Sequence, residues 1–318
     1  MKAIQVIAPQ RMRLVDVPIP APGPGQVLVR MEALSICGTD MRRYRHPQPA
    51  YPLEAGVPCH ECAGTIVESR ADGWKEGQRV ILLPALNMNG GAEYVVGSPS
   101  MLIALPPEGD AGEWLMCQPW GTVLYALERV GSVLGKQVVV VGQGAIGLLF
   151  TMSLLRMGAD FVAVVDPLEE RLALARRLGA HLTLNPHRQD AVKALLEATQ
   201  GRGGDLVVEA SGEPEAIDTA LQVARVYGTV VLFGIPEEDR VHLHYFEVLR
   251  KQLTLLATVS ATSEDPTRFI KLAVELRRRG FADPAWIITH RMGLEDAPRA
   301  YDLYARRAEG VVKVVLKV

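Results

Sequence analysis

The segment KQVVVVGQGAIGLLF, residues 136–150, limits the fold of this chain more than any other feature. The apolar run VVVV is followed by Gly142, Gly144 and Gly147 in the spacing G-x-G-x-x-G, and an apolar segment continues from there. This order predicts a buried strand, a tight turn and a helix in direct succession. A strand followed by a helix is the repeating unit of a parallel α/β sheet.

The residues that follow continue this alternation. We expect strands at 161–166, 181–185, 205–212 and 228–234, and helices at 167–180, 188–200 and 214–228. Buried strands that alternate with helices are typical of a doubly wound parallel sheet. The sequence therefore predicts an α/β protein with a Rossmann dinucleotide-binding domain over residues 119–260.

The glycine loop also predicts a ligand. Gly142 would allow the tight turn, Gly144 would let a pyrophosphate approach the backbone, and Gly147 would let helix and strand pack closely. Ala145 and Ile146 would offer the free N–H groups of the first helical turn to that pyrophosphate. The alternative is a structural turn that binds no ligand.

Two charged residues bear on which dinucleotide would bind. Asp166 ends the second strand, 19 residues after Gly147. A carboxylate there suits the ribose hydroxyls of NAD and would repel the 2′-phosphate of NADP. Arg171, one turn into the next helix, would lie beside the ribose, so NADP is not excluded. In the structural alternative, Asp166 only caps a helix.

The rest of the chain has a different character. Residues 1–118 contain short apolar runs between glycine, proline and charged residues, as in GQVLVRMEAL and CAGTIVES, a pattern typical of a β-rich domain. Residues 261–318 contain two helical stretches and end in the strand VVKVVLKV. The simplest organisation joins 1–118 and 261–318 into one domain, into which the Rossmann domain is inserted.

Composition excludes several classes of function. With 318 residues, 48% hydrophobic and 22% charged, the chain resembles a globular protein of about two domains. A net charge of -2 gives no reason to expect nucleic acid or a membrane surface as a partner. The first residues do not resemble a signal peptide, so we expect a cytoplasmic protein whose four cysteines are reduced.

Two short motifs bring together potential metal ligands. SICGTD contains Cys37, and His60 with Glu61 beside it follows 23 residues after that cysteine. A thiolate and an imidazole at two separate strand ends, with carboxylates nearby, suit Zn²⁺.

At this point the chain resembles the zinc-dependent medium-chain dehydrogenase/reductase family. The resemblance covers nearly the whole length and rests on CGTD, CHECAGTIVE, GGAEYVV, VVVVGQGAIGLL with Asp166, GTVVLFG and GVVKVVLKV. It implies a GroES-like β domain plus a Rossmann domain, with the active site between them. It also implies that Cys37 and His60 hold a catalytic zinc, that Glu61 is a ligand or an exchangeable neighbour, and that Thr39 takes the alcohol proton.

The third protein ligand departs from the family pattern. Relatives have Glu or Cys where this chain has Gln118, and Cys117 is adjacent. We treat this segment as extended, so that the two side chains point in opposite directions and only one reaches the metal. Gln118 is the favoured ligand, and Cys117 is the alternative.

A second departure affects the expected proton relay. Relatives often have histidine where this chain has Arg42, and an arginine stays protonated at any working pH. Either the proton reaches solvent through a ribose hydroxyl without this residue, or His46 replaces the relay histidine. Arg42 and Arg43 would favour a substrate with a carboxylate or phosphate, or they face solvent or the cofactor pyrophosphate.

The remaining cysteines and the zinc count complete this prediction. The four-cysteine lobe of many relatives is replaced by the short segment PALNMN, so we expect at most one zinc per chain. Cys59 and Cys62 are expected to be buried small residues, with Cys59 as an alternative zinc ligand.

The resemblance implies NAD-dependent oxidation of a secondary alcohol, reversible as ketone reduction. Gly234 would let the nicotinamide approach the backbone, and Lys313 would meet the pyrophosphate or else lie solvated on an edge strand. The substrate would be a polyol, sugar, amino alcohol or hydroxy acid, near Tyr44, Tyr51, Trp120 and residues 86–89. We expect a homodimer or homotetramer. The alternatives are a zinc-free NAD(P)H reductase and a non-catalytic dinucleotide-binding protein.

Overall fold

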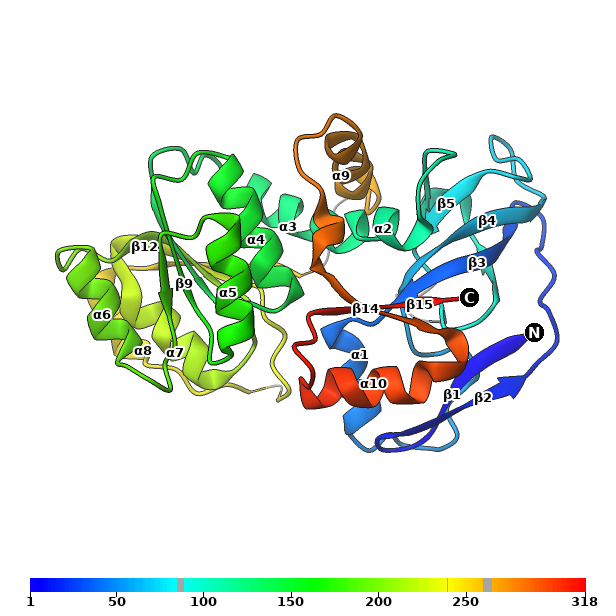
Figure 1. Ribbon diagram of the computed structural model, residues 1–318, viewed down its shortest axis with the longest axis horizontal. Helices are drawn as coiled ribbons and strands as arrows, with labels where there is room; N and C mark the ends of the chain where they lie inside the picture. The colour runs from blue at the N-terminus through cyan, green and yellow to red at the C-terminus, as the bar shows by residue number, and fades with distance from the viewer. Residues whose placement is uncertain (85–88, 239, 260–264) are drawn as a thin grey trace. The chain divides into compact units, whose positions relative to one another are not determined.

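The computed structural model describes residues 1–84, 89–238, 240–259 and 265–318 (Figure 1). Contacts divide the chain into two compact units, of which unit 1 comprises Met1–Gly121 and Ser263–Val318, and unit 2 comprises Thr122–Thr262. Within the described residues, every helix is too short or too polar to cross a bilayer.

Unit 1 is built around strands. Its strands are β1 (Lys2–Ala8), β2 (Arg11–Asp16), β3 (Val27–Ser35), β4 (Glu61–Ser69), β5 (Arg79–Leu82), β6 (Tyr94–Gly97), β7 (Leu102–Ala104), β14 (Ile288–Gly293) and β15 (Lys313–Lys317). Its helices are α1 (Gly38–Arg45), α2 (Ala111–Leu115), α9 (Arg268–Arg278), α10 (Ala297–Arg306) and the short 3₁₀ turns η2 (Pro99–Met101), η3 (Pro284–Ile287) and η4 (Leu294–Asp296). A seven-stranded sheet has the order β14-β15-β3-β4-β5-β7, with β6 also on β3, while β1 and β2 form a separate pair.

The centre of this sheet is the antiparallel pair β3 and β4. Both strands are mostly buried and contribute valine, leucine, isoleucine and methionine to one core that α10 also covers. At Gly64 the strands approach so closely that a Cβ would lie 2.1 Å from the carbonyl oxygen of Arg30, beside a register shift. At the other end, Ser35 of β3 pairs with Glu61 of β4. This pairing fixes where the predicted metal ligands lie.

Unit 2 is a six-stranded parallel sheet with the order β10-β9-β8-β11-β12-β13. Its strands are β8 (Gln137–Val141), β9 (Phe161–Val165), β10 (Leu182–Leu184), β11 (Gly204–Glu209), β12 (Ala224–Leu232) and β13 (Thr254–Ala257). Its helices are α4 (Ala145–Arg156), α5 (Glu169–Leu178), α6 (Ala191–Ala198), α7 (Pro214–Val223) and α8 (Tyr245–Lys251), and α3 (Cys117–Val130) enters from unit 1. The strands are valine-rich because both faces of a parallel sheet are covered.

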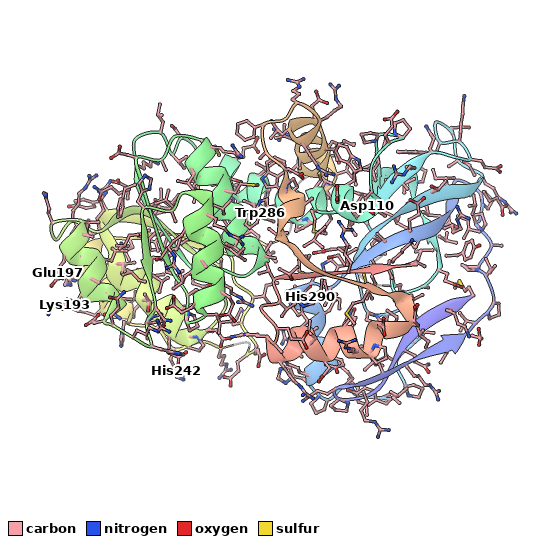
Figure 2. The ribbon with its side chains drawn as sticks, in the orientation of Figure 1. Asp110, Lys193, Glu197, His242, Trp286 and His290 are labelled. Carbon is pink, nitrogen blue, oxygen red and sulfur yellow. The ribbon has the colours of Figure 1, made fainter. Side chains whose placement is uncertain are left out.

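Helices α5 and α6 of unit 2 lie within the stretches predicted for them. Helix α5 ends at Gly179, whose φ of 104° lies in the left-handed region that terminates helices. On α6, Lys193 and Glu197 lie one turn apart (Figure 2) and form a 4.0 Å ion pair. The predicted α/β fold class is confirmed.

Several local predictions were wrong. Helix α7 ends at Val223 and β12 already begins at Ala224, whereas the helix was predicted to continue to residue 228. Strands β13 and β14 were not predicted. Helix α1 was missed as well, although Asp40 in its first turn and Cys37 at its N-cap form a capping box.

Candidate metal centre and dinucleotide loop

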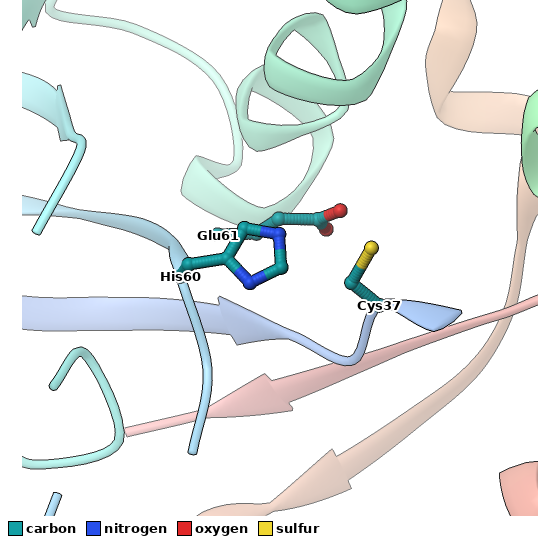
Figure 3. A group of neighbouring side chains, drawn as sticks. All are labelled: Cys37, His60 and Glu61. Carbon is teal, nitrogen blue, oxygen red and sulfur yellow. The ribbon is translucent and has the colours of Figure 1, made fainter. Parts of the chain in front are cut away.

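Three potential metal ligands converge in unit 1. One ligand atom each of Cys37, His60 and Glu61 lies within 4.8 Å of the others (Figure 3). The three residues come from the two strand ends that the sequence singled out. A cysteine sulfur, an imidazole nitrogen and a carboxylate oxygen form a donor set that zinc accepts.

The backbone explains this convergence. Cys37 follows β3 by two residues and is the N-cap of α1, whereas His60 immediately precedes β4. Because Ser35 and Glu61 pair across the sheet, the chain leaves β3 beside the place where it enters β4. Two segments 23 residues apart in the sequence therefore share one corner of the sheet.

Asp40 holds this corner together. Its Oδ2 accepts a hydrogen bond from the Cys37 N–H at 2.9 Å, and its Oδ1 accepts one from the Cys59 N–H at 3.1 Å. The same Oδ1 lies 3.6 Å from Nδ1 of His60. Asp40 is buried, and Nδ1 of His60 has no hydrogen-bond partner among the described residues, so this contact is electrostatic rather than a hydrogen bond.

The electrostatics of the corner favour a cation. Burial opposes a charged His60, yet Cys37 and Asp40 more than compensate and raise its pKa to about 12. In the metal-free protein the imidazole is therefore protonated. A zinc ion would displace that proton and supply the positive charge itself.

Glu61 has a partner that the sequence did not predict. Nζ of Lys313 lies 2.8 Å from Oε1 and 2.7 Å from Oε2 of Glu61. Lys313 begins β15, which lies inside the sheet between β14 and β3, and its side chain is only 2% exposed. The expectation of a solvated edge-strand lysine is wrong. Burial alone would lower the pKa of Lys313, but Glu61 raises it above its usual range.

The segment of the expected third ligand is helical rather than extended. Cys117 and Gln118 are the first two residues of α3, and both are buried. Successive side chains of a helix differ in direction by about 100°. The prediction that Cys117 and Gln118 point in opposite directions, so that only one could reach the metal, is therefore wrong. Burial raises the pKa of Cys117 to about 12, so without a metal it is a neutral thiol.

The two cysteines that flank His60 and Glu61 are not part of the cluster. Sγ of Cys59 faces the carbonyl oxygens of Ser35 and Glu61 at 3.5 and 3.3 Å, and Sγ of Cys62 faces that of Gly90 at 3.7 Å. Both side chains are buried. They are small core residues, as predicted, and Cys59 does not join the three ligand atoms.

Helix α1 carries the residues expected to handle protons. The Oγ1 atom of Thr39 is buried and has no hydrogen-bond partner among the described residues. Arg42 lies one turn further along and is exposed. Residues 86–88 of the expected substrate wall lie outside the described residues.

The glycine loop of unit 2 has the geometry that the spacing predicted. Gly142 has a φ of 92°, which only glycine adopts readily. Gly147 touches the turn so closely that a Cβ would lie 1.8 Å from the carbonyl oxygen of Gly142. Gly144 is the N-cap of α4, and the nearest atom to a Cβ there is Nη1 of Arg171 at 3.8 Å.

Asp166 ties this loop to the next strand. Its Oδ2 accepts a hydrogen bond from the Gln143 N–H at 2.6 Å, and its Oδ1 accepts one from the Leu168 N–H at 2.8 Å. Arg171 lies 3.9 Å from the same carboxylate. The charged pair thus sits at the edge of the glycine loop.

Sequence reasoning missed Glu209. This buried residue ends β11, and its Oε1 accepts hydrogen bonds from the Ser211 N–H, the Ser211 hydroxyl and the Gly212 N–H at 2.7–2.9 Å. Burial raises its pKa, although these donors oppose the rise. Gly234 packs against this loop, since a Cβ there would lie 2.1 Å from the Gly212 nitrogen. A carboxylate at the end of the buried strand DLVVE was the available signal.

Comparisons with known proteins identify the family of this chain. A family model described as a zinc-binding dehydrogenase matches residues 145–275, and one described as an alcohol dehydrogenase GroES-like domain matches residues 23–126. These matches define the class as zinc-binding dehydrogenases. An uncharacterized zinc-type alcohol dehydrogenase-like protein of Haemophilus influenzae is 31% identical over 268 residues, which cover 75% of this chain and 77% of that protein. The chain belongs to the zinc-dependent medium-chain dehydrogenase family, a family of oxidoreductases that act on small molecules.

Solved structures extend this similarity over the whole length. The alcohol dehydrogenase TADH of Thermus sp. ATN1 is 25% identical, with a TM-score of 0.90 and 100% of both chains covered. A putative zinc-binding dehydrogenase of Sinorhizobium meliloti 1021, bound to NADP, is 26% identical with a TM-score of 0.86 and covers 100% of this chain and 99% of its own. The predicted family and the GroES-like and Rossmann parts of the fold are confirmed.

Proposed function

We propose that this protein is a zinc-dependent dehydrogenase that transfers hydride between NAD(H) and a secondary alcohol or its ketone, with one zinc per chain. The observation that carries the proposal is the convergence of Cys37, His60 and Glu61 in a chain of the zinc-binding dehydrogenase family. Zinc supplies Lewis acidity, which lowers the pKa of an alcohol, and the nicotinamide supplies the hydride chemistry.

Each residue of the corner has a role in this proposal. Cys37 and His60 hold the zinc, and Gln118 is the neutral third donor. Thr39 takes the alcohol proton through its buried hydroxyl, which has no other partner among the described residues, and passes its own proton on toward solvent through a ribose hydroxyl of the cofactor or through His46. Arg42 stays protonated, so it stabilises negative charge near the substrate instead of relaying protons.

The glycine loop determines the proposed cofactor. Gly142, Gly144 and Gly147 leave room for a pyrophosphate at the N-terminus of α4, where Ala145 and Ile146 offer backbone N–H groups. The charged carboxylate of Asp166 favours NAD over NADP. Arg171 beside it moderates this preference, and the relative from Sinorhizobium meliloti, which is bound to NADP, supports that moderation.

The substrate in this proposal is a small alcohol with further polar groups, such as a polyol, a sugar, an amino alcohol or a hydroxy acid. The name of the Thermus relative, an alcohol dehydrogenase, supports the alcohol group. The exposed guanidinium of Arg42 supports an additional anionic or strongly polar substituent.

We also propose that the protein is a homodimer or homotetramer. Strand β13 is the last strand of its sheet, and Leu255 on it is exposed. Tyr245, Phe246 and Leu249 of α8, which precedes β13 in the chain, are exposed as well, and exposed apolar residues that gather on one surface mark interaction sites. Light scattering coupled to size exclusion measures the mass in solution, and a monomer at micromolar concentration would contradict this assignment.

Turnover by a zinc-site variant tests the proposed function. Zinc-reconstituted protein is mixed with NAD and secondary alcohols, and NADH absorbance is followed. We expect Cys37→Ala to lose zinc and turnover by at least a hundredfold while NADH binding, measured by fluorescence, is retained. Cys62→Ala, a buried cysteine outside the cluster, is the matched control and should keep its zinc. Turnover without zinc would favour the zinc-free reductase, and NADH binding without turnover would favour the non-catalytic alternative.

A further inference from the structure

The Glu61 carboxylate faces two competing positive partners. One of its oxygens belongs to the cluster of ligand atoms with Cys37 and His60. Both of its oxygens also lie within 2.8 Å of Lys313 Nζ. Glu61 is 1% exposed and Lys313 is 2% exposed, so water does not weaken this pair.

The sheet places the lysine directly beneath the metal ligands. Val315 of β15 and Glu61 of β4 both pair with Ser35, the last residue of β3. Continuing the antiparallel register by two residues places Lys313 opposite Cys37. The backbone supports this extension, because the Ile36 N–H donates to the Val314 carbonyl at 3.1 Å.

The charges of the corner balance only when Lys313 is included. Cys37 as a thiolate, Asp40 and Glu61 give three negative charges, against two of zinc and one of Lys313. Gln118 adds no negative charge, in contrast to the carboxylate or thiolate that relatives have at that position. Without Lys313, Glu61 would be an uncompensated buried carboxylate beside a divalent cation, which would attract it strongly.

We propose that Lys313 is a positioning residue that holds Glu61 beside the metal rather than on it, and thereby keeps one coordination position open for the substrate. This inference rests on the proposed function. If the ion pair controls the metal site, removing Lys313 changes zinc affinity. If the pair only stabilises the fold, removing Lys313 leaves zinc affinity unchanged.

The test measures zinc affinity by competition with a chelator. Lys313→Met keeps the length of the side chain and removes its charge, so Glu61 becomes free to bind the metal. We expect zinc to bind at least tenfold more tightly and turnover to fall about 10–100-fold, the range seen when partners of metal ligands are removed. Lys313→Arg should restore wild-type zinc affinity. Unchanged or weaker zinc binding in Lys313→Met would overturn the inference.

A double variant keeps the test decisive if Lys313→Met does not fold. Lys313→Met with Glu61→Gln removes both charges together, which buried pairs tolerate far better than the loss of one partner. We expect its zinc affinity to stay within about threefold of wild type, because Glu61 is not a ligand while Lys313 holds it. A loss of more than tenfold would show that Glu61 is a ligand in the wild type and would refute the inference.

A matched control separates the general effect of replacing a buried lysine by methionine from the specific effect on the metal site. Lys251 is a buried lysine of unit 2 whose Nζ donates to the carbonyls of Leu221, Gln222 and Ala224 at the end of α7. Lys251→Met should lower stability without changing zinc affinity. Absence of zinc from the wild type would refute the proposed function itself, whereas zinc binding with unaltered affinity in Lys313→Met refutes only this inference.

Discussion

The four cysteines differ in exposure and in the pKa of their thiols. Cys37 is partly exposed, whereas Cys59, Cys62 and Cys117 are buried. Burial raises the pKa of Cys117 to about 12. The neighbouring Cys62 thiol and burial also hold the pKa of Cys59 well above its usual value. Thiolates react and thiols do not, so raised pKa values keep these cysteines inert.

This contrast predicts the pattern of thiol labelling. In native, metal-free protein at pH 8, we expect a disulfide reagent to modify one thiol per chain rapidly, and Cys37→Ala to abolish that reaction. Cys117 should stay unmodified up to about pH 10, because its pKa is about 12. Zinc should protect Cys37. Rapid modification of two or more thiols in the native state would contradict the described burial.

Asp166 allows a prediction on cofactor choice. Asp166→Asn removes the charge but keeps an oxygen that can accept from the Gln143 N–H. We expect NADH affinity to fall and NADPH affinity to rise, changing their ratio by about tenfold, or 1.4 kcal/mol, as measured by fluorescence titration. Equal changes for both nucleotides would contradict the ribose role.

At the residue scale, the sequence identified Cys37, His60 and Glu61, but it assigned Lys313 to the pyrophosphate and not to Glu61. The three ligand candidates follow from motifs of a few residues. The Lys313–Glu61 pair joins residues 252 positions apart, and only the strand order β15-β3-β4 brings them together. No local pattern carries that information.

Among the elements, the turn from β8 to α4 offers a comparison of two glycines. A Cβ at Gly147 would collide with the Gly142 carbonyl, whereas a Cβ at Gly144 would make an ordinary 3.8 Å contact. We therefore expect Gly147→Ala to lower the free energy of unfolding by about 3 kcal/mol, as overpacking does, and to weaken dinucleotide binding. Denaturant unfolding and NADH titration measure the two effects.

Gly144→Ala should behave differently. Its backbone, with φ of -68°, accepts alanine, so stability should change by less than about 0.5 kcal/mol. NADH affinity should nevertheless fall at least tenfold, because a methyl group would block the pyrophosphate. Retained affinity in this variant would mean that the loop does not bind a dinucleotide in the way proposed.

Sequence patterns predicted some helices and strands correctly and failed for others. The strands and helices around the glycine loop were predictable because apolar runs and glycine stops are local signals. The segment at Cys117 and Gln118 was treated as extended, yet helix α3 begins at Cys117 with proline at its third position, and proline is well tolerated in a first helical turn. Helix α1 was missed because its eight residues, GTDMRRYR, are mostly polar, and Met41 and Tyr44 are too few to give a clear apolar periodicity.

At the scale of the whole molecule, tryptophan fluorescence reports on the unfolding of unit 1 separately from unit 2. All four tryptophans, at positions 74, 114, 120 and 286, belong to unit 1, which also holds the metal cluster. Chelation should therefore lower the midpoint of unfolding followed by tryptophan fluorescence. At zinc a hundredfold above its Kd, the loss is about 2.7 kcal/mol. An unchanged midpoint would place the zinc outside unit 1 or exclude it.

The most direct measurement is zinc content per chain by elemental analysis, on protein purified without added metal and again after reconstitution. We expect one zinc per wild-type chain, none in Cys37→Ala, and one in Cys62→Ala. No zinc in the reconstituted wild type would contradict the proposal that Cys37 and His60 hold the catalytic zinc of a dehydrogenase. So would a full complement in Cys37→Ala.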